Sequence, residues 1–258
     1  MRVALLSSQP HDLTLRWVEG GLRSLGHEVE TTHRPDLALT DAAPVGYRLA
    51  DGWTGAPDAV LALGTAAGLA GLVATREHPA DLLLRLDRPG RSGNTETTRV
   101  EGALARGAGA VLAGSPTDAE ALVRLGVPRR RLHLLPEAVD AADVRPVTVD
   151  DDPQPVVALD ESAESVHALL RGMAAGRPAV VVDEGVLPDL VADGVCGLVA
   201  GRPGLRAAVQ SLVADSVRRA SMGMAAADRV SACYDTPVVV EALGRLLDET
   251  AGRQTRAA

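Results

Sequence analysis

The first half of the chain repeats one pattern, in which a short apolar run precedes a stretch with apolar residues at helical spacing. The apolar runs at residues 3–6, 59–63, 82–86, 110–113 and 132–135 predict strands, with a further strand starting at Val29. The intervening periodic stretches predict helices over residues 13–25, 64–74, 95–106 and 117–125. Short apolar strands that alternate with helices are typical of an α/β protein, in which helices cover both faces of a parallel sheet.

The same alternation returns after residues 146–155, which are rich in Asp and Pro and have no periodicity. We therefore expect an N-terminal Rossmann-like domain over residues 1–145, a linker over 146–155 and a smaller C-terminal domain over 156–258. The second domain is expected to hold strands at 156–159, 179–182 and 197–200, with helices at 165–175, 188–192, 205–214, 217–231 and 237–250.

Composition narrows the chemistry that the protein can perform. The 258 residues include no Lys, so all 26 basic residues are Arg, which excludes mechanisms that need a lysine amine. A net charge of -8 disfavours nucleic acid as a partner, and no apolar stretch reaches the roughly 18 residues of a transmembrane segment. Only Cys196 and Cys233 are present, without a C-x-x-C motif, so we expect no disulfide, metal site or cofactor in a cytoplasmic protein.

Three stretches in order carry a resemblance to a known family. They are residues 115–140, which end in Leu-Pro-Glu-Ala-Val-Asp, residues 172–181, which read Gly-Met-Ala-Ala-Gly-Arg-Pro-Ala-Val-Val, and residues 187–199. Together they resemble the retaining glycosyltransferases of family 4. The resemblance implies the GT-B fold, which has two Rossmann-like domains, and a nucleotide-sugar donor site on the second of them. It also implies that the final helix packs back on the first domain.

The donor-site motifs of this chain depart from the family pattern. Two glutamates eight positions apart hold the donor in the family, and Ala163 and Arg171 stand at those positions here. Glu164 lies nearby but has no glutamate eight residues on, and a guanidinium offers donors and no acceptor. The resemblance also implies Ser115 and Arg177 as donor-binding candidates, together with Asp183, Glu184 and Gly185, where the family keeps a glycine pair.

The family segment whose Arg and Lys neutralise the donor diphosphate has no counterpart after the linker, so we expect a truncated donor domain. These departures predict a pseudo-glycosyltransferase, an accessory or binding subunit with a nucleotide or sugar ligand and a protein partner, as a homo- or hetero-oligomer such as a dimer. The alternative is an active enzyme that transfers a hexosyl group from a nucleotide sugar. Such an enzyme would rebuild its donor site with Arg171, Arg177 and Arg202.

The acceptor side departs as well, because the loop after the first strand reads Ser7-Ser8-Gln9-Pro10-His11 in place of a glycine-rich loop. Asp87 stands where many members of the family have a histidine after a central strand, which makes it the candidate catalytic residue. Arg85, Arg88 and Arg91 surround it. This charged stretch either binds an anion or forms a solvated loop with local ion pairs.

Other motifs leave alternatives open. The glycine-rich residues 64–71 follow a strand and open a helix, which fits either a dinucleotide site or tight packing of small residues on the sheet. Ser115 and Cys196 lack a neighbouring base in the sequence, so neither forms a recognisable nucleophile motif. His133 and His167 lie among apolar residues, which favours structural roles, and the run Arg129-Arg130-Arg131 favours a solvated surface.

Overall fold

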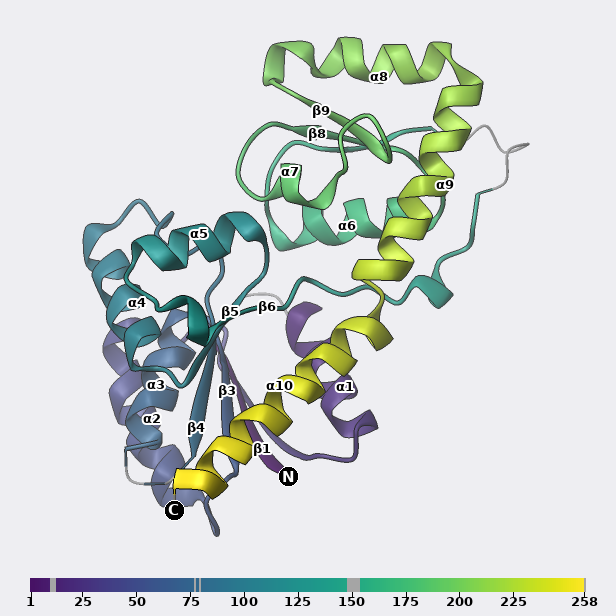
Figure 1. Ribbon diagram of the computed structural model, residues 1–258. Helices are drawn as coiled ribbons and strands as arrows, with labels where there is room; N and C mark the ends of the chain where they lie inside the picture. The colour runs from purple at the N-terminus through teal and green to yellow at the C-terminus, as the bar shows by residue number, and fades with distance from the viewer. Residues whose placement is uncertain (10–12, 77, 79, 148–153, 258) are drawn as a thin grey trace. The chain divides into compact units, whose positions relative to one another are not determined.

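The computed structural model of the chain describes residues 1–9, 13–76, 78, 80–147 and 154–257, with side chains as far as residue 250. These residues form two compact units, one of Met1–Leu135 with the chain from Val240 onward, and one of Pro136–Val239. Residues 148–153 of the expected linker lie outside the described residues. Both units are built from parallel strands and helices (Figure 1), which confirms the predicted α/β fold.

The described residues of the first unit contain a six-stranded parallel sheet in the order β2-β1-β3-β4-β5-β6. Its strands are β1 (Arg2–Ser7), β2 (Glu28–His33), β3 (Ala59–Leu63), β4 (Asp81–Arg85), β5 (Ala110–Ala113) and β6 (Leu132–Leu134). The helices between them are α1 (Leu13–Ser24), α2 (Ala42–Gly52), α3 (Thr65–Ala74), α4 (Thr95–Gly107) and α5 (Pro116–Arg124).

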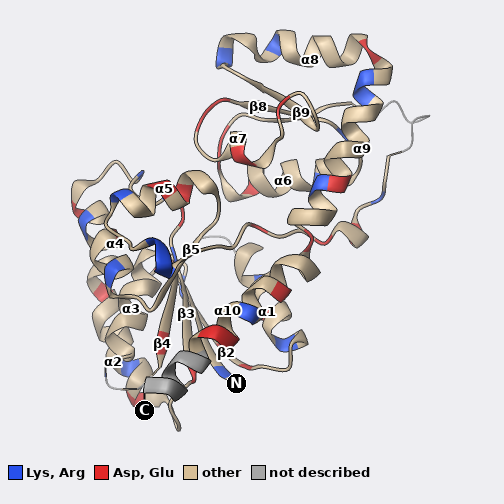
Figure 2. Ribbon diagram, viewed as in Figure 1, with Lys and Arg blue, Asp and Glu red and all other residues tan. Residues whose placement is uncertain are grey.

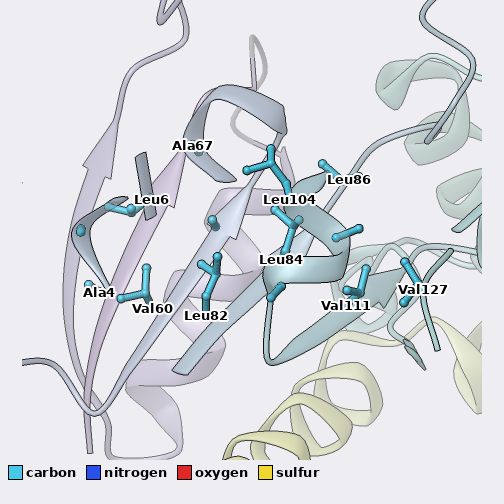
Figure 3. Close-up of a cluster of buried hydrophobic side chains, with 14 of the residues drawn as sticks. Ala4, Leu6, Val60, Ala67, Leu82, Leu84, Leu86, Leu104, Val111 and Val127 are labelled. Atoms are coloured by element: carbon cyan, nitrogen blue, oxygen red, sulfur yellow. The ribbon is translucent and has the colours of Figure 1, made fainter. Parts of the chain in front are cut away.

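Both faces of this sheet are apolar and buried. One core cluster joins alternate residues of the strands, including Leu6, Val60 and Leu84, with Leu104 of α4 (Figure 3). The intervening strand residues, such as Leu5 and Leu61, are fully buried as well. A parallel sheet that is buried on both faces gives continuous apolar runs in the sequence, and for this reason the strands could be predicted from the sequence.

Helix α2 is an element that the apolar pattern does not predict. Small residues form most of its contact with α3: Ala42 and Val45 pack with Ala66 and Ala70. A Cβ on Gly46 would lie 2.5 Å from the carbonyl oxygen of Ala70, so the two helices approach closely only because this position is glycine. Small residues contribute little to a hydrophobic pattern, and the helix is missed for that reason.

The second unit has a three-stranded parallel sheet among its described residues, in the order β7-β8-β9. Its elements are β7 (Val156–Ala158), α6 (Ala163–Ala174), β8 (Ala179–Val182), α7 (Leu187–Leu190), β9 (Gly197–Ala200), α8 (Leu205–Ala214) and α9 (Ser216–Cys233). Its core includes Leu169, Met173 and Val181. No helix in the described part of the chain is long and apolar enough to cross a membrane.

The last helix, α10 (Thr236–Ala257), begins in the second unit and belongs to the first from Val240 onward. There it packs on α1 (Figure 1), where a Cβ on Gly21 would overlap the side chain of Val240. Val240 is 5% exposed, so it has little room to move away. Gly20, the preceding residue, has no atom within 4 Å of the same position.

The two adjacent glycines of α1 provide a matched test of this packing. We expect Gly21→Ala to destabilise the first unit by about 1–3 kcal/mol, because the added methyl group overpacks the contact with Val240. Gly20→Ala adds the same methyl group in open space, and we expect it to raise the free energy of unfolding by up to about 1 kcal/mol through helix propensity. Urea denaturation measures both, and equal stabilities of the two variants would contradict the packing.

Candidate functional site

The strand order of the first unit reverses between β1 and β3, which makes this pair a topological switch point. The chain leaves β1 towards β2 on one side of the sheet, and it enters β3 on the other. In open α/β sheets, ligands bind outside the carboxyl ends of the strands at such a switch point. Ser8 and Gln9 follow β1 at this edge, and Gly64 follows β3, while residues 10–12 lie outside the described residues.

The loop after β1 is bound to the start of α3. The Ala67 N–H donates a hydrogen bond to Ser8 Oγ over 3.0 Å. Gly64 has a φ of +97°, and a Cβ there would lie 2.7 Å from the same hydroxyl oxygen. Farther along α3, a Cβ on Gly68 would lie 2.6 Å from Leu84 Cδ1. The glycines of residues 64–71 therefore allow close packing of α3 on the sheet.

Asp87, the candidate catalytic residue, lies at this edge and accepts a hydrogen bond from Gln9 Nε2. The neighbouring arginines bind other parts of the chain. Arg85 is 4% exposed and donates to the Leu135 carbonyl over 2.8 Å. Arg91 pairs with Asp118 over 2.7 Å. Of the three arginines, Arg88 is exposed and has a positive φ of 47°.

Asp118 is a charged group of this region that the sequence analysis does not select. It lies in the first turn of α5, which belongs to a part of the first unit where acidic and basic residues are interspersed (Figure 2). Ser115 caps this helix, because its Oγ accepts the Asp118 N–H over 3.0 Å. Ser115 was expected to bind a donor, and the structure gives it this capping role. The S-x-x-D spacing is the signal that could have identified the pair.

Burial raises the pKa of Asp118 to about 6, although the guanidinium groups of Arg91 and Arg85 and the Ser115 hydroxyl lower it. Asp118 is 6% exposed, so desolvation of its carboxylate outweighs the attraction of its partners. The ion pair with Arg91 therefore forms fully only above about pH 6.

The candidate donor-site residues lie on two elements of the second unit. Ala163 and Glu164 form the first turn of α6, and both are exposed. Arg171 lies two turns farther along the same helix and is also exposed. Asp183 and Glu184 follow β8 and are exposed.

Glu184 forms a bidentate ion pair with Arg202. Arg202 Nε and Nη2 donate to the two carboxylate oxygens over 2.8 and 2.7 Å. Arg202 Nη2 also contacts the Leu159 carbonyl over 3.4 Å, so it links the loops that follow β7 and β8. The hydrogen bonds from Arg202 lower the pKa of Glu184. Arg177, in contrast, lies in the turn between α6 and β8. Its side chain reaches the residues before β7, where its Nε donates to the Gln154 carbonyl over 2.7 Å and its Nη2 to the Pro155 carbonyl over 3.2 Å.

Glu161 makes a second link between the same two loops. Its Oε2 accepts the N–H of Val186 over 3.1 Å. Gly185 has a φ of +62°, and a Cβ there would overlap this carboxylate oxygen. Two physical constraints therefore favour glycine at position 185: the positive φ of its backbone and the adjacent carboxylate of Glu161. Sequence reasoning notes Gly185 but not its contact with Glu161, which is 24 positions earlier in the chain.

His167 lies one turn before Arg171 on α6 and is partly buried. Its Nδ1 is buried and has no hydrogen-bond partner in the described part of the protein. Burial and the guanidinium of Arg171 lower the pKa of His167, while Glu137 and Asp140 raise it. The imidazole is therefore neutral at pH 7. No group of three or more His, Cys, Asp or Glu residues in the described ranges is arranged to hold a metal ion.

No protein-family model and no curated protein matches the chain by sequence. Its fold is similar to that of HepE from Anabaena, solved in complex with UDP, with a TM-score of 0.72 and 14% identity over 96% of this chain and 100% of the other. It is also similar to sucrose-phosphate synthase from Thermosynechococcus elongatus, with a TM-score of 0.76 and 14% identity over 96% and 98% of the two chains.

A glycosyltransferase from Rickettsia africae matches with a TM-score of 0.70 and 9% identity over 96% of this chain and 98% of the other. These similarities, with the parallel sheets of both units, confirm the predicted fold class. The protein has the fold of the GT-B glycosyltransferases.

The ionisation of Asp118 predicts a pH dependence of stability. Because its pKa is higher in the folded protein than the usual 3.8, unfolding releases a proton between about pH 4 and 6, and stability falls as the pH rises through this range. The resulting fall in the free energy of unfolding is about 3 kcal/mol. Asn cannot titrate, so the unfolding free energy of the wild type should fall relative to Asp118→Asn between pH 4 and 7.

Urea denaturation at several pH values measures this difference. Asp228→Asn, at an exposed position of α9, controls for the loss of one carboxylate. A difference between wild type and Asp118→Asn that stays constant from pH 4 to 7 would show that Asp118 is already ionised throughout.

Proposed function

We propose that this protein is a pseudo-glycosyltransferase, a GT-B-type accessory or binding subunit that does not transfer a sugar. The observation that carries this proposal is that groups of the chain itself already bind two of the arginines that could hold a donor. An active enzyme needs cations to stabilise the leaving nucleotide diphosphate. Arg177 is bound to two backbone carbonyls and Arg202 to Glu184, so the chain's own groups occupy two of the three arginines available for this role.

The acidic residues of the second unit also support the pseudoenzyme proposal. Neither Ala163 nor Arg171 supplies a carboxylate at the positions that hold the donor in family 4. Glu161, whose carboxylate lies against Gly185, accepts the Val186 N–H. Moving Glu161 or Glu184 onto a donor would break contacts that join the loops after β7 and β8.

An active glycosyltransferase is the second candidate function. The observation that favours it is the exposed guanidinium of Arg171. Its guanidinium is exposed and forms no hydrogen bond or ion pair within the described part of the chain, and the neutral His167 lies one turn away. The structures of HepE contain UDP and UDP-glucose. Under this second function, a nucleotide sugar is therefore the ligand class that we propose for the second unit.

We also propose that a protein partner, or a second copy of this chain, covers part of the second unit. Strand β7 pairs with β8 and with no other strand in the described ranges. Val157 and Leu159, in and just after this strand, are 44% and 48% exposed. An edge strand with exposed apolar residues is typical of a surface that another chain covers.

The two functions differ in turnover. Under the pseudoenzyme proposal, calorimetry with UDP, GDP and their sugars should show no micromolar binding, and coupled assays should detect no nucleotide release from UDP-glucose. Arg171→Ala should change neither result. Turnover that the wild type shows and Arg171→Ala loses would overturn the proposal and support a rebuilt donor site, with Arg124→Ala, an exposed position on α5, as the matched control.

The partner proposal has a separate readout. We expect light scattering of the purified protein to give the mass of a dimer, or affinity capture from its natural host to recover one stoichiometric partner. Either complex should dissociate in the variant Val157→Glu, because a charge on the β7 edge disfavours strand pairing and apolar contact. Arg171→Ala should leave it intact. A monomer that captures no partner would refute this part of the proposal.

A further inference from the structure

The first unit contains a hollow of about 390 Å³ that is separate from the groups described above. It lies between the turn that follows β2 and the first turns of α2. Its lining includes four charged residues, two of each sign: Arg34, Arg48, Asp36 and Asp41. The remaining lining residues are Pro35, Leu37, Pro44 and Val45, of which Leu37 and Val45 pack in an apolar cluster and give the hollow an apolar floor. Its volume is in the range of small-molecule sites.

The four charged side chains do not neutralise one another. Within the described part of the chain, none of them forms a side-chain hydrogen bond or ion pair. Asp41 is the N-cap residue of α2, a position where Asp ordinarily binds the helix N–H groups, yet its carboxylate makes no capping hydrogen bond. Two guanidinium groups and two carboxylates, all on exposed residues, therefore line one hollow without hydrogen-bond or ion-pair partners among the described residues.

The backbone that carries these groups is fixed on both sides. The Arg34 N–H donates to the Ser7 carbonyl over 2.8 Å, and the Arg34 carbonyl accepts the Leu37 N–H over 3.1 Å. Pro35 restricts this turn further. On the other side, Asp41, Val45 and Arg48 share one face of α2, because they are four and three residues apart. Val45 anchors this face in the cluster with Ala66 and Ala70.

We propose that this hollow binds a small phosphomonoester that also carries hydroxyl groups. Guanidinium groups bind phosphate through paired, charge-assisted hydrogen bonds, which assigns the phosphate to Arg34 and Arg48. Carboxylates accept hydrogen bonds from hydroxyl groups, which assigns these to Asp36 and Asp41. The apolar floor contacts the carbon skeleton. The two carboxylates disfavour a ligand that is anionic throughout, so bare phosphate binds more weakly than its hydroxylated ester.

Glucose 6-phosphate, inorganic phosphate and glucose are suitable probes for calorimetry on the full chain. We expect glucose 6-phosphate to bind at least ten-fold more tightly than either of the other two. Arg34→Gln and Arg48→Gln should each weaken it at least ten-fold. Asp36→Asn and Asp41→Asn should weaken glucose 6-phosphate several-fold without weakening inorganic phosphate, because they remove hydroxyl acceptors and not phosphate donors.

Arg130→Gln is the matched control, since Arg130 is exposed and lies outside the hollow. All of these residues are exposed and none forms a side-chain hydrogen bond or ion pair with the described residues, so circular dichroism should show folded variants. The proposal is overturned if glucose 6-phosphate shows no saturable binding, if inorganic phosphate binds equally well, or if Arg130→Gln weakens binding as much as Arg34→Gln. None of these results depends on the nucleotide site proposed for the second unit, whose titrations use separate ligands and variants.

Discussion

The six-stranded sheet of the first unit is apolar on both faces, and each face must be removed from water. Burial of this apolar area is the dominant favourable term in folding, so it determines which elements the unit needs. Small residues on α2 and α3 let these helices form a close layer on one side. On the other side lies α1, against which α10 packs from Val240 onward. Buried residues of α10, such as Leu243 and Leu247, are thus part of the first unit.

Once the strands are held in this way, their carboxyl ends bring polar groups together at one edge, and most of these groups bind each other. Ser8 binds the first turn of α3, Gln9 binds Asp87, and Arg91 binds Asp118. Polar groups of the second unit also bind each other, because Glu161 accepts the Val186 N–H and Glu184 pairs with Arg202. The hollow at Arg34 and Arg48 differs, because its charges are held apart on rigid backbone.

Much of the fold could be predicted from the sequence because doubly buried strands appear as apolar runs. The runs at β3 and β8 match their strands at both ends. Helix α2 was not predicted because three of its four buried residues, Ala42, Gly46 and Ala50, are small. The site was less accessible to prediction, since its main contacts join distant positions. Ser115 and Asp118 share a local capping pattern, whereas the pairing of Glu161 with Val186 and of Arg202 with Glu184 depends on how β7, β8 and β9 are placed side by side.

The contact between Glu161 and Gly185 also constrains how the protein can change over evolutionary time. Any side chain at position 185 collides with the carboxylate, and it must also adopt a φ of +62°. Shortening residue 161 removes the collision but leaves the Val186 N–H without its acceptor. The two positions are therefore epistatic. A lineage that places a larger side chain at 185 must first shorten residue 161 and supply another acceptor for the Val186 N–H, so the order of substitutions decides which variants of this loop are accessible.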